Sequence, residues 1–114
     1  MISITVDEGY AFDYLAILSV KTLRGIYEPD VFLNCVKVLK EQIEDDELFD
    51  KILESQEYAE CVRINGDVFD AVYKAKLDQI KASVVDNLNY ERYLAKIKLQ
   101  NRFFPKSKIV EKKN

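Results

Sequence analysis

The stretch that decides the fold is Tyr10-Ala-Phe-Asp-Tyr-Leu-Ala-Ile-Leu-Ser-Val-Lys-Thr-Leu23, which is apolar on nearly every side of a helical projection. Such a helix packs at the centre of a bundle or against a partner subunit, and Gly25 is expected to end it. Its middle carries one charged residue, Asp13. If Asp13 is buried, it needs a cation, either Lys21 or one from the C-terminal segment. If it marks a solvent-facing stripe, it needs none, and both alternatives stay open.

Apolar residues three and four positions apart continue along the rest of the chain. They predict a mainly α fold, a compact bundle of about five helices. Pro29 suits the first turn of a helix, Ser55 suits an N-cap, and Asn87 and Asn89 are expected to mark a break before the last helix. The segments expected after the first helix are 29–43, 44–53, 55–64, 67–84 and 90–104.

Two short stretches have other signals. Ile2, Ile4 and Val6 alternate with polar residues, which predicts a short N-terminal β-strand. Asn65-Gly66 is compatible with the turn of a β-hairpin, which gives an α+β alternative, or with a helix stop that leaves Asp67 as the next N-cap. Apolar residues at helical spacing after the pair favour the helix stop.

The 114 residues fit one helical domain over 1–114, with a basic C-terminal tail over 105–114. Residues 1–91 contain 9 Lys and Arg against 19 Asp and Glu, a net of −10, whereas residues 92–114 contain 8 against 1, a net of +7. The basic end is expected to fold back onto the acidic body or, less favourably, to bind an anion. A sequence pI near 5.0 argues against nucleic acid as the partner.

The start of the chain does not resemble a secretory signal, and no apolar run is long enough to span a membrane, so the sequence predicts a cytoplasmic protein. The all-round apolar first helix is compatible with a homo-oligomer. Cys35 and Cys61 lie in apolar helical patterns and are expected to be buried thiols.

The chain contains no histidine, which removes triad catalysis and nearly all zinc sites, and we expect no cofactor and no metal. Carboxylates three residues apart offer one enzymatic alternative, a Mg²⁺-dependent all-α nucleotide phosphohydrolase. Ile64 stands where the second motif of those enzymes has a carboxylate. A non-enzymatic binding or accessory module is therefore favoured. The carboxylate pairs are Glu41 with Glu44, Glu57 with Glu60, and Asp67 with Asp70.

The chain resembles an uncharacterised family of small helical proteins from bacteria and phages. Its opening is similar to the family's Gly-Glu-x-x-Asp-Lys-x-x-Ile-Leu-x-x-Lys, with matches at Gly9, Asp13 and Lys21. Residues 89–96 are similar to the family's Asn-Asp-x-Arg followed by a Lys, and residues 107–113 to its Ser-x-x-x-Glu-x-Lys tail. Tyr10, Tyr14 and Tyr90 depart from the pattern. The family has no assigned activity, and the resemblance implies only that the basic tail belongs to the domain and that a link to sugar nucleotides or glycans exists.

Two sets of candidate site residues follow. If Asn89 caps the last helix, the first N–H groups of that helix point outward beside Arg92 and Lys96, which predicts a site for an anion such as a phosphate or sugar nucleotide. Asp13 and Lys21 form a second candidate polar site. No catalytic or metal-binding residue is predicted.

Overall fold

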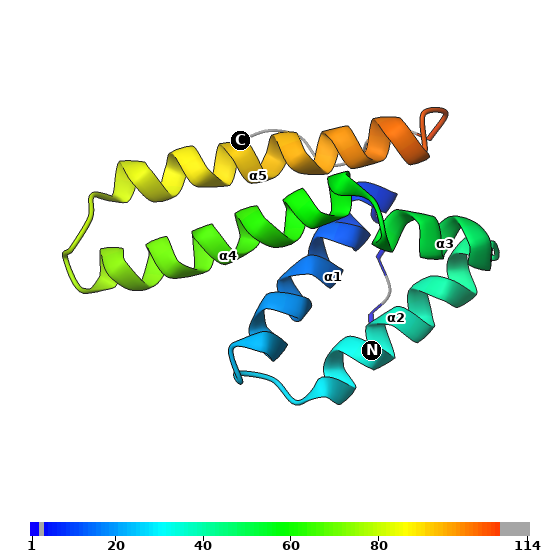
Figure 1. Cartoon of the computed structure of the whole chain (residues 1–114), viewed down its shortest axis with the longest axis horizontal. Coiled ribbons are helices and arrows are strands. Elements are labelled where there is room, and N and C mark those ends of the chain that lie inside the picture. The colour runs from blue at the N-terminus through cyan, green and yellow to red at the C-terminus, as the bar shows by residue number, and fades with distance from the viewer. Residues whose placement is uncertain (3, 108–114) are drawn as a thin grey trace.

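The computed structural model describes residues 1–2 and 4–107, and these residues form five helices joined by short turns (Figure 1). The mainly α prediction is therefore confirmed. None of these helices combines the length and the apolar content that a membrane-spanning segment needs. The helices are α1 (Glu8–Leu23), α2 (Pro29–Ile43), α3 (Asp46–Leu53), α4 (Gln56–Lys76) and α5 (Ala82–Phe103).

The two longest helices, α4 and α5, form an antiparallel hairpin along the long axis of the molecule, which measures 45 × 32 × 31 Å (Figure 1). Helix α1 packs against both helices near the end of the hairpin where α4 begins, and runs away from them at a wide angle. Helices α2 and α3 lie on the other side of α1. The opposite end of the hairpin extends beyond the other helices.

Three of the sequence signals for helix ends are confirmed, at Gly25, Pro29 and Ser55. The side chains of Asp7, Asp45 and Ser55 accept hydrogen bonds from backbone N–H groups in the first turns of α1, α3 and α4, as N-caps do. Pro29 is the first residue of α2. Gly25 follows α1 with a φ of 74°, a left-handed conformation that glycine adopts without steric cost.

Neither interpretation of Asn65-Gly66 is correct. Both residues lie in the middle of α4, which continues from Gln56 to Lys76 without a turn. Glycine in a helix interior costs about 1 kcal/mol relative to alanine. The burial of Cys61, Ile64 and Ala71 on the same helix offsets this cost.

The expected position of the last helix is also wrong. The chain turns at residues 77–81, and α5 begins at Ala82, so Asn87 and Asn89 lie inside the helix. The turn has no glycine or proline; Asp78 adopts the left-handed conformation instead, with a φ of 57°. Asp is among the few residues besides glycine that tolerate this conformation, so the apolar periodicity alone gave no sign of the turn.

The predicted N-terminal strand does not form among the described residues, which here exclude Ser3. Ile2 and Ile4 are exposed, and no second extended segment lies beside them in the part of the chain that the structure describes. A strand needs a hydrogen-bonding partner. Of the predicted basic tail, residues 105–107 follow α5, and residues 108–114 lie outside the described residues.

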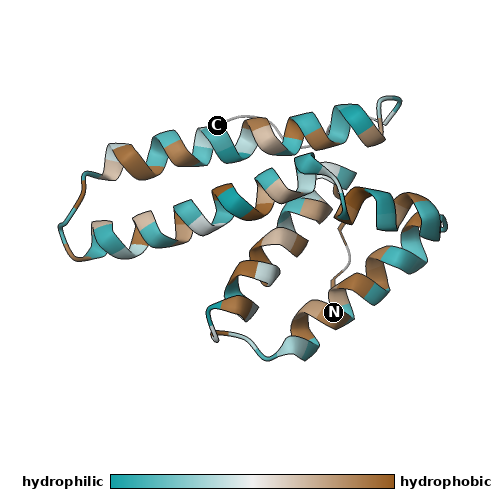
Figure 2. Cartoon of the chain, in the orientation of Figure 1, coloured by the Kyte–Doolittle hydropathy of each residue, from teal (hydrophilic) through white to brown (hydrophobic). Residues whose placement is uncertain are grey.

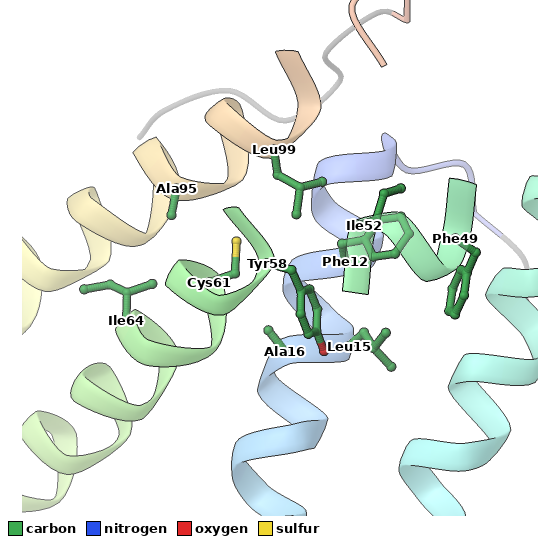
Figure 3. Close-up of a cluster of buried hydrophobic side chains, with 10 residues drawn as sticks. All are labelled: Phe12, Leu15, Ala16, Phe49, Ile52, Tyr58, Cys61, Ile64, Ala95 and Leu99. Atoms are coloured by element: carbon green, nitrogen blue, oxygen red, sulfur yellow. The ribbon is translucent and has the colours of Figure 1, made fainter. Parts of the chain in front are cut away.

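The hydrophobic core lies where α1 meets α3, α4 and α5 (Figure 3). Figure 2 shows the corresponding pattern along the hairpin, in which apolar and polar positions alternate around the helices. Helix α2 has no fully buried residue and covers the core with a half-buried apolar face. The buried members of the core are Phe12, Leu15, Ala16, Phe49, Ile52, Tyr58, Cys61, Ile64, Ala95 and Leu99.

The two helical glycines are expected to respond in opposite ways to alanine. A Cβ at Gly66 meets only the Nη2 of Arg24, at 3.7 Å, so Gly66→Ala should raise the free energy of unfolding by about 1 kcal/mol through helix propensity. A Cβ at Gly9 lies 3.0 Å from the backbone oxygen of Lys96. Gly9→Ala should therefore lower the free energy of unfolding by about 1–3 kcal/mol. Urea unfolding followed by circular dichroism measures both. A stabilised Gly9→Ala variant would contradict the close packing of α1 on α5.

Candidate functional site

Asp13 is buried in the middle of α1, with 1% of its surface exposed. Arg92 of α5 holds the carboxylate: its Nε lies 3.1 Å from each carboxylate oxygen, and its Nη2 donates to Oδ2 at 2.6 Å. The sequence left open whether Asp13 is exposed or paired, and the paired alternative, with a cation from the C-terminal segment, is confirmed. Lys21, the other expected partner, does not contact this carboxylate.

Asn65 of α4 completes this polar cluster, and it too is buried. Its Nδ2 donates to Oδ1 of Asp13 at 2.9 Å and to the backbone carbonyl of Cys61 at 2.8 Å. Both partners can only accept hydrogen bonds, so the chemistry fixes which end of the amide faces them. Three helices are thus tied together by Asp13, Asn65 and Arg92, which we call the polar triad.

The buried position of the triad alters nearby ionisation. Burial lowers the pKa of the Arg92 guanidinium, but hydrogen bonds and charge from Asp13 outweigh this effect, so the net pKa is raised. Burial lowers the pKa of Lys96, and the charge of Asp13 offsets only part of the shift. Burial, reinforced by the charge of Asp13, raises the pKa of the Cys61 thiol to about 12. Cys61 is therefore a protonated core thiol at neutral pH.

A groove of about 400 Å³ opens beside the triad, between α1 and the second half of α4. Asn65 and Arg92 lie at its inner end, and Lys21 and Lys76, from the last turns of α1 and α4, also line it. No acidic side chain is among the lining residues, although residues 1–91 have a net charge of −10. The other lining residues are apolar or aromatic: Ile17, Val20, Val68, Phe69, Val72 and Tyr73. We call this feature the α1–α4 groove.

The structure does not bring together the three residues of the predicted anion site, Asn89, Arg92 and Lys96. Asn89 is exposed on α5 and lies seven residues beyond Ala82, so its neighbouring N–H groups belong to the helix interior and the predicted N-cap is wrong. Lys96 is nearly buried, with its Nζ 5.6 Å from the ring centre of Tyr10 and 6.0 Å from that of Tyr93. Of the three residues, Arg92 alone lines the α1–α4 groove, together with Lys21 from the second candidate set.

Asn65 is the member of the triad that the sequence did not identify as a site residue. Asparagine before glycine is the strongest short-range signal for a turn, so the pair predicts a turn or a helix stop. This signal gives no indication of the alternative, in which the amide of Asn65 points inward from a continuous helix. The spacing of Asn65 from Phe69, Val72 and Lys76, at helical intervals, is the signal that places all four on one face.

The carboxylate pairs that the enzymatic alternative requires are mostly engaged by arginines. Glu57 pairs with Arg102, Glu60 and Asp67 with Arg63, and Asp70 with Arg24. Ile64, which stands in place of the expected carboxylate, is fully buried in the core. Among the described residues, no group of three or more Asp, Glu, Cys or His side chains is close enough to hold a metal ion.

Comparisons with known proteins gave no relative. No protein-family model matches the chain, and no curated protein or solved structure is significantly similar to it.

Proposed function

We propose that this chain is a non-enzymatic binding module and that its ligand is a small anion with an apolar portion, held in the α1–α4 groove. The observation that carries the proposal is the composition of this groove: apolar walls, two lysines, an arginine whose charge Asp13 balances, and no acidic lining residue, in a body that is otherwise strongly acidic. Apolar pockets with a few placed polar groups are the usual form of small-molecule sites.

The proposal retains the anionic ligand suggested by the sequence but moves it from the start of the last helix to the groove. Arg92 is common to both locations, and Lys21 and Lys76 replace Asn89 and Lys96. In the groove the ligand meets apolar walls as well as cations, so burial of apolar surface adds to the charge attraction.

A binding role is favoured over catalysis because the polar groups of the groove are already held in place. Arg92 is fixed by a buried carboxylate, and the triad supplies neither a nucleophile next to a base nor a free carboxylate for acid–base work. The Mg²⁺-dependent phosphohydrolase is the less favoured candidate, because most of the carboxylates that lie three residues apart are paired with arginines. A hydrolysis assay with nucleoside triphosphates and Mg²⁺ tests it directly.

The test of the binding proposal is isothermal titration calorimetry with phenyl phosphate, octanoate and uridine 5′-monophosphate. We expect at least one of these amphipathic anions to bind the full chain with a dissociation constant below about 1 mM, an order-of-magnitude expectation for an apolar site with two charge contacts. The same ligand, at 100 times its dissociation constant, should stabilise the fold by about 2.7 kcal/mol.

The matched variants distinguish the groove from general charge attraction. Lys21→Ala combined with Lys76→Ala should weaken binding about tenfold, because two charge contacts of up to about 1 kcal/mol each are lost. Lys37→Ala combined with Lys51→Ala removes the same charge from exposed positions on α2 and α3 and should change the affinity less than twofold. Absence of binding for all three anions, or equal effects of the two double variants, would overturn the proposal.

A further inference from the structure

We propose that the ligand of the α1–α4 groove is a nucleotide, with the hydrogen-bonding edge of its base on Asn65 and Arg92 and its phosphate near Lys21 and Lys76. This inference rests on the proposed function, since it names the chemical class of the anion that the groove takes. It is argued from the polar atoms of the triad that remain unused.

The first unused atom is the Oδ1 of Asn65. Both N–H groups of this amide are engaged by Asp13 and by the carbonyl of Cys61, which leaves the amide oxygen as the end that faces away from them. This oxygen makes no hydrogen bond with the residues that the structure describes, and Asn65 lines the groove. Among the described residues, the buried side-chain oxygens without a hydrogen-bond partner are those of Thr22 and Tyr58, so the Asn65 oxygen is open to the groove, where a donor from a ligand can replace water.

The second unused group is the Nη1 of Arg92. The carboxylate of Asp13 occupies Nε and Nη2, so the guanidinium lies in one orientation and its third nitrogen keeps two N–H donors. The side chain of Arg92 is 28% exposed and also lines the groove. Asp13 thus positions two groups at once, one acceptor on Asn65 and one donor on Arg92.

An acceptor and a donor at one end of a groove select against a simple anion at that end. A phosphate or carboxylate offers only acceptors, and it is repelled by the amide oxygen of Asn65. A group with a donor next to an acceptor suits both, and the pairing edges of the nucleobases have this pattern, as the N3–H and the neighbouring carbonyls of uracil do. Proteins commonly read an unpaired base by hydrogen bonds to this edge.

The remainder of the groove suits the rest of a nucleotide. Phe69 and Tyr73 lie one turn apart on α4, opposite Ile17 and Val20 of α1, and aromatic and aliphatic walls of this kind hold the faces of a base. Eleven residues of helix separate Asn65 from Lys76, a rise of about 16 Å. A phosphate placed toward Lys76 is attracted by the two lysines that line the groove, Lys76 and Lys21, whereas the Arg92–Asp13 pair has no net charge.

The experiment compares three ligands by isothermal titration calorimetry on the full chain. Uridine 5′-monophosphate has the complete hydrogen-bonding edge of the base, and N3-methyluridine 5′-monophosphate lacks the N3–H donor of that edge. Phenyl phosphate has an aromatic ring without hydrogen-bonding groups. We expect the first to bind at least tenfold more tightly than the other two. Arg92→Lys keeps a cation for Asp13 without a free guanidinium N–H and should reduce this preference, with circular dichroism to verify that the variant folds.

The outcomes separate this inference from the proposed function. Equal affinities for the three ligands on the wild-type chain, or binding of octanoate alone, would overturn the nucleotide inference and leave the anion-binding groove standing. Absence of binding for all these compounds would overturn both proposals. Binding of uridine 5′-monophosphate that is unchanged by Arg92→Lys and by the Lys21 and Lys76 double variant would also overturn both, because the ligand would then lie elsewhere.

Discussion

Replacement of Arg92 by alanine is expected to lower the free energy of unfolding by about 3–5 kcal/mol, the usual cost of removing one partner from a buried ion pair. The variant leaves the carboxylate of Asp13 buried, with the amide of Asn65 as its single remaining hydrogen-bond donor among the described residues. Much of the cost is therefore the desolvation of a carboxylate that has lost its hydrogen-bonded cation and keeps only the nearby charge of Lys96. Urea denaturation measures the loss directly.

The chain contains a matched control for this experiment. Arg24, the residue that follows α1, forms a second two-pronged Arg–Asp pair with Asp70 of α4, but both side chains are more than 40% exposed. Because solvent screens exposed pairs, Asp70→Ala should cost less than about 1 kcal/mol. If Arg92→Ala and Asp70→Ala cost the same, burial is not what makes the triad important for stability.

A further variant tests whether the triad is there for stability at all. Replacing Asp13 and Arg92 together by leucine removes both charges, and exchanges of this kind in buried ion pairs are often neutral or stabilising. The expected result is a double variant that is more stable than either single variant. Such a variant would fold without the fixed donor and acceptor in the groove, so it should keep its helices and lose the nucleotide binding that we propose.

The parts of the fold that the sequence predicted are those where a local signal and the tertiary contacts agree. Asp13 is an example, because a charged residue in an all-round apolar helix must find a partner if that helix is central. The bounds of α2 are another, because Pro29 fixes its start and the apolar face runs to Ile43. In both cases the physical requirement could be stated without knowing which helix lies opposite.

The errors occur where tertiary packing overrides a local signal. Asn65-Gly66 has the composition of a turn, but the burial of neighbouring residues and the bond from Asn65 to Asp13 keep the helix continuous. The observed turn at 77–81 depends on Asp78 in a left-handed conformation. The residues of this turn include no glycine or proline, so their composition does not predict it. Because the turn at 77–81 was missed, the predicted last helix, 90–104, starts eight residues after the observed start at Ala82, and the predicted anion site is displaced with it.

The groove could not be predicted because it depends on the angle between two helices. Lys21 lies in α1, Lys76 in α4 and Arg92 in α5, and no spacing within the sequence relates these positions. Lys21 and Lys76 look like ordinary solvated residues of helix ends, because lysine is common in the last turn of a helix. The structure is what places them on one apolar surface.

The second large effect is expected at Phe12, which is fully buried where α1, α3 and the end of α5 meet. Its ring centre lies 5.8 Å from that of Phe49 and 6.2 Å from that of Phe104, so one side chain joins three segments that are distant in sequence. Phe12→Ala should therefore lower the free energy of unfolding by about 3–5 kcal/mol.

Two further variants, Tyr14→Ala and Phe12→Leu, test whether the loss of stability in Phe12→Ala comes from the cavity that it leaves. Tyr14 lies on the same helix with 44% of its surface exposed, so Tyr14→Ala should cost roughly 0.5 kcal/mol, as surface substitutions do. Phe12→Leu leaves a smaller void and should fall between the two alanine variants. An apolar cavity of this kind stays dry and can take up benzene, so benzene should raise the melting temperature of Phe12→Ala but not of Tyr14→Ala. If benzene has no effect, the helices have collapsed into the space, and the cost of Phe12→Ala should then lie at the lower end of its range.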